Sequence, residues 1–372
     1  MQTSQRRPDE LPPVEQVVPG LWSIPVPIPG SPLKQPARHP DVRPDRLQGS
    51  RGLGDARAAL PYVFAYAFEV PGGVVLVDPG WNAEEALAAL EAGLGSLGAR
   101  LTDVRGVLVT HLHPDHYGLA GRVREVSGAW IGLHPADAAL IPDRYEDADD
   151  LLRRISGWLE QTGAPAADLA ELRDATMQLR RFVVVARPDL PLADGDRPDL
   201  PGWRLRAVHT PGHTPGHLCF VEERTGVVLT GDHVLPTISP NIARHPQAGP
   251  DPLADYLASL ERLRRWGDGL ALPGHQWRFD GLTGRIDELI AQYAVAGATD
   301  SLVIGTDQAA GVIDIRANIL AARSGMRASA SVIASIASSS PVVASQRFPA
   351  RRGNVGVARG FTPFWISQAI AS

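Results

Sequence analysis

Several features that mark particular classes of protein are scarce in this sequence of 372 residues. Cys219 is the only cysteine, so no disulfide can form within the chain, and a disulfide-stapled secreted fold is excluded. No apolar run reaches the roughly 18 residues of a membrane-spanning helix, and the N-terminus has no apolar stretch of signal-peptide length. We therefore expect neither export nor a membrane span, and a reducing cytoplasm is the simplest compartment.

A strong excess of charge is also missing. The formal net charge of -5 gives no broad attraction for phosphate backbones or anionic lipids, so we expect no nucleic acid and no membrane as a partner. The composition, with 44% apolar and 21% charged residues, is that of a globular protein. A small molecule is the expected partner, and the sequence leaves the oligomeric state open.

Three regions differ in composition. Residues 1–60 contain a polar, Pro-rich leader, a first strand from about residue 18 and a Pro/Arg/Gly-rich loop. Residues 61–297 alternate between strand-like and helix-like patterns and are predicted to form the catalytic domain. Residues 298–372 contain no lysine or glutamate and have Ala/Ser runs, so a small helical element, a disordered tail and a shifted reading frame all stay open for them.

The apolar periodicity of the middle region predicts sheets flanked by helices, an α/β (α+β) fold. Asn82 and Glu85 resemble a capping box at the start of one helix, and two apolar stripes predict a helical hairpin over about residues 148–182. Further helices are predicted to begin at Asp251 and Pro252 and to span about 283–293. Strands are predicted over 62–70, 74–78, 104–110, 129–134, 203–210, 217–223, 226–232 and 269–275.

Three imidazoles and a carboxylate lie within six positions in the segment THLHPDHYG, directly after an apolar strand. Alternate residues His111 and His113 point to the same side of an extended chain and can chelate one ion. The turn at Pro114 brings Asp115 and His116 toward a second ion. The alternative to metal binding is that these are surface or core histidines whose hydrogen bonds go to backbone groups. The density of potential ligands in this segment disfavours that alternative.

Three further motifs also follow predicted strands. HTPGHTPGH presents His213, with Gly212 allowing a tight turn; LTGD presents Asp232, whose carboxylate could bridge two ions; and LPGH presents His275. Ordinary turn chemistry beside glycine is the alternative for these three residues. The remaining histidines of the region are expected to be structural or to support the site from outside: His134, His209, His217, His233 and His245.

In this order and spacing, HLHPDH, PGHTPGH, GD and PGH resemble the metal-binding motifs of the metallo-β-lactamase superfamily, in its hydroxyacylglutathione hydrolase or thioesterase-like branch. The resemblance implies a four-layer αββα sandwich, here with the helical hairpin as an insertion. It assigns metal one to His111, His113 and His213, metal two to Asp115, His116 and His275, and the bridging position to Asp232. Asp78 matches a loop aspartate that supports the site, although capping of its own DPG turn explains it equally well.

Such a site is expected to hold two divalent metal ions, with zinc expected and iron or manganese as alternatives. Two ions activate a shared water as a hydroxide nucleophile and polarise the bond under attack, so hydrolysis of a small ester-type bond is expected, with a thioester or lactone favoured. Asp115 is the expected catalytic residue because it can orient the nucleophile or shuttle its proton. True β-lactamases generally carry Cys or Ser where this chain has Asp232.

Two other functions stay open. A mononuclear iron persulfide dioxygenase would use the same fold, and a non-catalytic metal-binding or nucleic-acid-associated protein would keep the scaffold without turnover. The helical hairpin, which carries Trp158, Met177 and Phe182, is either a substrate lid or plain packing.

Overall fold

The computed structural model describes residues 11–29, 60–161, 180–242 and 244–298. The predicted Pro/Arg/Gly-rich loop, the second half of the helical hairpin and the C-terminal region lie almost wholly outside these residues. The proposed division into 1–60, 61–297 and 298–372 therefore stays a prediction.

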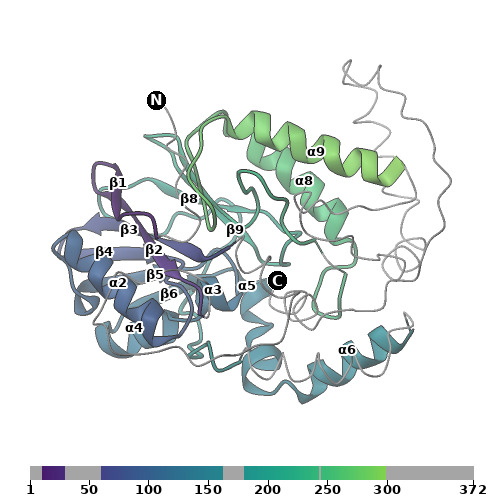
Figure 1. Ribbon diagram of the computed structural model, residues 1–372, viewed down its shortest axis with the longest axis horizontal. Helices are drawn as coiled ribbons and strands as arrows, with labels where there is room; N and C mark the ends of the chain where they lie inside the picture. The colour runs from purple at the N-terminus through teal and green to yellow at the C-terminus, as the bar shows by residue number, and fades with distance from the viewer. Residues whose placement is uncertain (1–10, 30–59, 162–179, 243, 299–372) are drawn as a thin grey trace, which may run out of the picture.

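Two sheets form the centre of the described structure (Figure 1). The larger sheet has its strands in chain order: β1 (Glu15–Val18), β2 (Leu21–Pro27), β3 (Tyr62–Val70), β4 (Gly73–Val77), β5 (Val104–Leu108), β6 (Trp130–Leu133) and β7 (Leu190–Pro191). The smaller sheet has the order β11 (Ala271–Pro273), β10 (Val227–Gly231), β9 (Leu218–Glu222) and β8 (Leu205–His209). Strands β1 to β4 are antiparallel neighbours, whereas β4 to β7 run parallel.

Helices connect and cover the strands. The described helices are α2 (Glu84–Ser96), η1 (Leu101–Asp103), α3 (Pro114–Tyr117), α4 (Ala120–Ser127), α5 (Pro135–Ala138), η2 (Pro142–Glu146), α6 (Asp149–Gln161), α8 (Pro252–Arg264) and α9 (Leu282–Ala298). In Figure 1, α2 and α4 lie beside the larger sheet, and α8 and α9 lie together on the other side of the molecule. None of these helices combines the length and apolar character needed to cross a bilayer.

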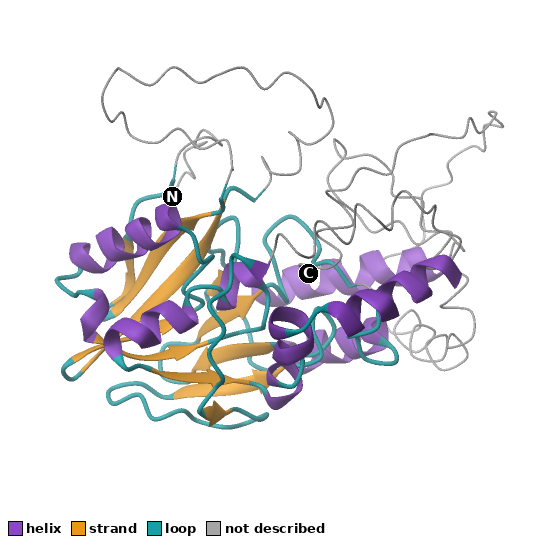
Figure 2. Cartoon of the chain, turned by 90° about the horizontal axis from the view of Figure 1, so that it is seen from below, coloured by secondary structure: helices purple, strands orange, loops and turns teal. Residues whose placement is uncertain are grey.

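The sequence of β3 shows why the sheets stack. Both faces of YVFAYAFEV are apolar, because the strand lies between two layers rather than facing water. Val63 and Ala65 pack toward the cluster that contains α2 and α4, whereas Phe64 and Tyr66 pack toward the smaller sheet. A third cluster lies between the smaller sheet and helices α8 and α9. Figure 2 shows the strands gathered between helices. The expected four-layer αββα arrangement stays a prediction.

Most predicted strands and helices within the described residues are present, and the mixed α/β fold is confirmed. The start of α8 also follows the prediction, since Asp251 caps the helix by accepting a hydrogen bond from the Ala254 amide at 3.0 Å. Of the predicted helical hairpin, α6 is described, and residues 162–179 lie outside the described part. A role of this hairpin as a lid stays a prediction.

The predicted capping box at Asn82 and Glu85 is wrong. Helix α2 begins after Ala83, which makes no side-chain cap. The Asn82 side chain instead donates to the carbonyl of Arg181 at 3.3 Å, and the Asn82 amide donates to the carbonyl of Phe182 at 2.9 Å. The Asn82 side chain therefore contacts a segment about a hundred residues away in the chain instead of capping the helix. Strand β1, within the leader, was also not predicted.

Candidate metal centre

The loop after β5 presents the first group of predicted ligands. His111 and His113 lie in the bend that follows the strand, and Pro114 then starts the short helix α3, which carries Asp115 and His116. The rings of His111 and His113 lie 4.5 Å apart between centroids, and those of His111 and His116 lie 4.1 Å apart. All three histidines are at most 2% exposed. The strand end and the helix start therefore hold them in one cluster.

Asp78, at the end of β4, holds this loop from behind. Its backbone is left-handed, with φ of 54°, and its carboxylate is buried. One oxygen accepts the Thr110 amide at 2.8 Å; the other accepts the Thr110 hydroxyl at 2.7 Å and lies 2.8 Å from Nδ1 of His116. Nδ1 of His116 is thereby fixed as a donor, which leaves Nε2 free to face the cluster. Asp78 makes the supporting contacts that the resemblance implied.

The smaller sheet and its loops supply the other three predicted ligands. His213 precedes β9, and its Nδ1 faces the carbonyl of Asn241 at 2.8 Å, so that Nε2 points inward. Asp232 follows β10 directly, and His275 follows β11, with Nδ1 of His275 2.9 Å from the carbonyl of Tyr62. Both histidines are oriented by a carbonyl oxygen.

The structure brings all seven predicted side chains together. Three groups have ligand atoms within 4.8 Å of one another: His111, His113 and His213; His111, His116 and Asp232; and Asp115, His116 and His275. Asp232 lies between the two sets, with Oδ1 3.4 Å from Nε2 of His116 and Oδ2 3.4 Å from Nε2 of His275. The same Oδ2 lies 3.9 Å from Nε2 of His213. Assignment of each residue to one of two ions stays a prediction.

The atoms in this cluster suit divalent cations. Nε2 of His111, Nε2 of His116 and Oδ1 of Asp232 are buried and find no hydrogen-bond partner among the residues that the structure describes, although buried polar atoms normally have one. Nε2 of His213 and Nδ1 of His113 face each other at 3.0 Å. Since Nδ1 of His213 donates to Asn241, its Nε2 carries a lone pair. Imidazole nitrogens and carboxylate oxygens with free lone pairs are the ligands that zinc prefers.

The electrostatics divide the cluster into two halves. Burial and the neighbouring imidazoles hold the pKa of His111 well below its usual value, and burial followed by His213 and Arg144 does the same to the pKa of His113. Burial also lowers the pKa of His116, but the carboxylates of Asp232, Asp115 and Asp78 outweigh it and raise that pKa overall.

In the second half, the carboxylates of Asp232 and Asp115 raise the pKa of His275 to about 10 against the effect of burial. Burial would raise the pKa of Asp232, but His275 and His116 outweigh it and keep that pKa well below its usual value. One half thus offers neutral imidazoles, and the other concentrates negative charge where a cation can replace the protons.

Close packing leaves room for nothing larger than glycine at two positions next to predicted ligands. A Cβ on Gly274 would lie 2.6 Å from Oδ1 of Asp232 and 2.6 Å from Cε1 of His116. Gly212, which the sequence marked for a tight turn, has φ of 142°, and a Cβ there would meet the backbone and Cβ of Tyr256. Both glycines lie beside ligand residues in the chain and let separate loops approach closely.

Asp137, which the sequence analysis did not single out, joins the two halves of the centre. Its side chain is fully buried in α5. One oxygen accepts the Leu112 amide at 3.0 Å and the Thr214 hydroxyl at 2.8 Å, and the other accepts the Gly216 amide at 2.6 Å. Leu112 lies between two predicted ligands, and Thr214 follows a third. Like the known motifs, Asp137 follows a strand end, β6, and that position was the available signal.

The other histidines lie around the centre rather than in it. His217 accepts the Asp232 amide on Nε2 at 3.2 Å, and its Nδ1 lies 2.9 Å from the Thr210 hydroxyl, so it supports the bridging residue. His233 is buried beside Tyr256. His134 and His209 stack on each other with ring centroids 4.0 Å apart. These positions agree with the structural and supporting roles predicted for them.

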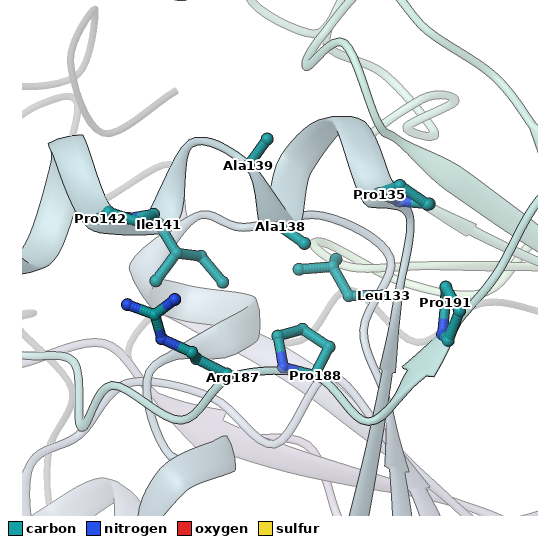
Figure 3. Close-up of a pocket in the computed structure, with 9 residues that line it drawn as sticks. All are labelled: Leu133, Pro135, Ala138, Ala139, Ile141, Pro142, Arg187, Pro188 and Pro191. Carbon is teal, nitrogen blue, oxygen red and sulfur yellow. The ribbon is translucent and has the colours of Figure 1, made fainter.

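An apolar hollow of about 360 Å³ lies elsewhere, between β6, α5, η2 and the segment before β7 (Figure 3). Leu133, Ile141, Pro142 and Arg187 are among its lining residues, and none of the seven predicted ligands lines it. The hollow is therefore separate from the cluster of predicted ligands.

Comparison with known proteins agrees with the fold and the motifs. Residues 59–275 match the metallo-beta-lactamase superfamily, and the chain belongs to this family. The crystal structure of a metallo-beta-lactamase family protein from Thermus thermophilus is similar, with a TM-score of 0.67, 29% identity and coverage of 85% of this chain and 95% of that one. A beta-lactamase domain protein from Burkholderia ambifaria has a TM-score of 0.54 at 25% identity, with 77% of each chain covered.

Curated relatives are similar over part of their length. A probable metallo-hydrolase of Bacillus subtilis (strain 168), YqjP, is 30% identical over 207 residues, which are 54% of this chain and 63% of that protein. The atrochrysone carboxyl ACP thioesterase AgnL7 of Paecilomyces divaricatus is 33% identical over 102 residues, which are 27% of this chain and 30% of that protein. The match therefore spans less than two thirds of each of these relatives.

Proposed function

We propose that this member of the superfamily is a metal-dependent hydrolase that cleaves a small ester-type bond, with a thioester favoured and a lactone as the second choice. The position of Asp232 carries the proposal. Its two oxygens reach His116, His275 and His213, so one carboxylate touches both halves of a cluster that otherwise consists of imidazoles and Asp115. A bridging carboxylate of this kind suits two cations close together.

The residues of this chain would hold the ions through His111, His113 and His213 on one side and Asp115, His116 and His275 on the other. When bound, two divalent ions lower the pKa of a water and polarise the carbonyl oxygen under attack. Asp78, Asn241 and Tyr62 orient the imidazoles through Nδ1, which keeps the opposite nitrogens aimed inward. Burial keeps His111 and His113 neutral, the form in which imidazole binds a metal.

Asp115 is the residue placed to move a proton. Its side chain is 17% exposed and that of Asp232 is 13% exposed, whereas the His116 and His275 side chains are at most 1% exposed, so a substrate would meet these carboxylates first. In hydrolysis of a thioester, the water oxygen bonds to the carbonyl carbon, and Oδ2 of Asp115 takes the water proton. The C–S bond then breaks, and the proton passes to the departing sulfur. Water and thioester thus give an acid and a thiol.

One observation favours a thioester among the ester-type bonds, and a second argues against a β-lactam. Relatives of this chain include proteins named as acyl-carrier-protein thioesterases, in Paecilomyces divaricatus and in a Cryptosporiopsis species. Position 232 also carries an aspartate, where true β-lactamases usually carry Cys or Ser. The sulfur of a thioester is a good leaving group that needs a single proton, which Asp115 can supply.

Metal analysis of the purified protein, joined to turnover assays on thioesters, lactones and phosphodiesters, tests the proposal. About two zinc ions per chain with thioester turnover is the expected result, and Asp232→Asn should lose metal and most of the rate. The exposed Asp149→Asn should behave as the unchanged protein. One iron ion with oxygen consumption would establish a persulfide dioxygenase instead, and metal-free protein without turnover would establish a non-catalytic role.

A further inference from the structure

Beside the neutral half of the centre lies a buried arginine that keeps an unsatisfied N–H group among the described residues. Arg144, in η2, is 5% exposed. Its Nη1 donates to Oε1 of Gln247 at 3.0 Å, and its Nη2 has no hydrogen-bond partner. Asp137 is close enough to be affected by this guanidinium, but both oxygens of that carboxylate are occupied by three other donors. Asp137 thus supplies negative charge nearby but no acceptor for Nη2, and a buried donor left without an acceptor is unfavourable, so an acceptor supplied from outside would stabilise it.

Gln247 adds a second unused donor to the same place. It is also 5% exposed, and its Nε2 has no partner. Since a guanidinium can only donate, Oε1 is the Gln247 atom that faces Arg144, and the neighbouring Nε2 is left with its donors unused. The two side chains thus hold each other through one hydrogen bond and keep one free N–H group each. Among the described residues no acceptor meets either group.

Both residues belong to segments that touch predicted metal ligands. Tyr145, next to Arg144, donates to the carbonyl of Leu112 at 2.7 Å, and Leu112 lies between His111 and His113. Gln247 belongs to the loop that follows Asn241, whose carbonyl faces Nδ1 of His213. The charge of Arg144 is near enough to lower the pKa of His113. The donor pair therefore lies next to the three-histidine half of the centre.

We propose that Arg144 and Gln247 form a subsite for a carboxylate carried by the substrate. Two donors on neighbouring groups can meet the two oxygens of a carboxylate, the planar acceptor that matches a guanidinium. A phosphate monoester would bring nearly two charges against one. The inference rests on the proposed hydrolase and makes it more specific: the preferred acyl group ends in a carboxylate, as in a glutaryl thioester.

The binding test measures the affinity of the full-length purified protein for glutarate and for neutral dimethyl glutarate by calorimetry. Glutarate should bind, and Arg144→Met should weaken it at least tenfold, to the level of the diester. Arg153→Met is the matched control, since the Arg153 side chain is 71% exposed on α6, and it should bind glutarate as the unchanged protein does. Equal affinity in Arg144→Met, or no glutarate binding at all, would overturn the subsite; in the second case the donors hold water.

Gln247→Glu separates recognition from structure. A carboxylate at this position would occupy the guanidinium from within the protein, so the variant should melt at a higher temperature and lose glutarate binding at least tenfold. A pair with only a structural role would give the higher melting temperature with unchanged binding. This variant also keeps the test decisive if Arg144→Met fails to fold.

Turnover distinguishes this inference from the proposed function. The ratio of kcat/KM for a glutaryl thioester to that for a butyryl thioester should exceed ten in the unchanged protein and fall about tenfold in Gln247→Glu. A ratio near one would overturn the carboxylate preference while leaving the hydrolase in place. Arg144-dependent glutarate binding without turnover of any thioester would keep the subsite and reject the hydrolase.

Discussion

The hydroxyl of Thr214 donates to the carboxylate of Asp137 at 2.8 Å, and through this bond the loop of the smaller sheet that carries His213 is tied to the loop of the larger sheet that carries His111. The same carboxylate accepts the amides of Leu112 and Gly216. Each half of the candidate centre is therefore positioned relative to the other by a residue that is not itself a predicted ligand.

Asp137→Asn should weaken metal binding by about 10- to 100-fold, because an amide nitrogen cannot accept the hydrogen bonds of the oxygen that it replaces. Stability should fall by about 1 to 3 kcal/mol, since the amide of either Leu112 or Gly216 would be left buried without an acceptor. Competition with a chelator measures the first effect and urea unfolding the second. Asp149→Asn, at an exposed position of α6, is the control. Unchanged metal affinity would show that the two loops are positioned independently.

Asp115→Asn should lower kcat by about 100-fold while the protein keeps most of its metal. Asparagine retains one oxygen toward the cluster but cannot take a proton from water. Rates and metal content are measured on the same preparation. A variant that loses metal and rate in parallel would show that Asp115 acts as a ligand alone.

Gly274→Ala should disturb the centre, because the added methyl group would meet Asp232 and His116 at 2.6 Å. We expect a loss of about 1 to 3 kcal/mol in stability and weaker metal binding. Gly95→Ala is the matched control: this glycine lies in α2 with nothing within 4 Å of the added Cβ, and alanine should stabilise the helix slightly. If both variants bound metal equally well, the close packing at Gly274 would have no role in the site.

Acid stability should depend on His134. Burial, followed by the stacked ring of His209, lowers the pKa of His134 to about 4, and its Nδ1 accepts the Ala136 amide at 3.1 Å. As pH falls from 7 toward 4.5, the unfolded chain gains a proton on this imidazole that the folded chain does not, so folded stability is lost in this window.

His134→Asn removes this titration and keeps a side chain that can cap α5. The variant should lose less stability than the unchanged protein between pH 7 and 4.5, by an amount on the order of 1 kcal/mol, because solvent screens this partly exposed ring and reduces the effect. Urea unfolding at the two pH values measures the difference. Equal losses in both proteins would show that His134 carries no part of the acid sensitivity.

Prediction from sequence worked best where a physical requirement, such as burial of a strand on both sides, leaves a visible local pattern in the sequence. Strands such as β3 are buried on both sides and are visible as apolar runs, and the seven predicted ligands stand directly after strand ends or at sharp turns. Strand ends of stacked sheets meet along one edge, so the motifs could be expected to converge although His111 and His275 are far apart in the chain. The family match over residues 59–275 is in accord with that expectation.

The failures share one cause, which is that distant contacts replaced local ones. Asn82 was predicted to cap α2, but its hydrogen bonds go to Arg181 and Phe182. Nothing near Arg144 in the sequence shows that Gln247 will meet it. Asp137 follows a strand end, as the ligands do, but an isolated aspartate in HPADA has no partner in sequence that would indicate its three hydrogen bonds.

The participation of both sheets in the candidate centre has a consequence for how the protein matures. His275 leaves the ribosome long after the His111 loop, and the last ligand arrives only when β11 pairs in parallel with β10, a contact that bridges a long stretch of chain. A nascent chain that ends before β11 would lack part of the candidate centre, so occupation of all seven predicted ligands would have to follow synthesis of the chain up to His275. Metal uptake would then serve as a late checkpoint on correct assembly.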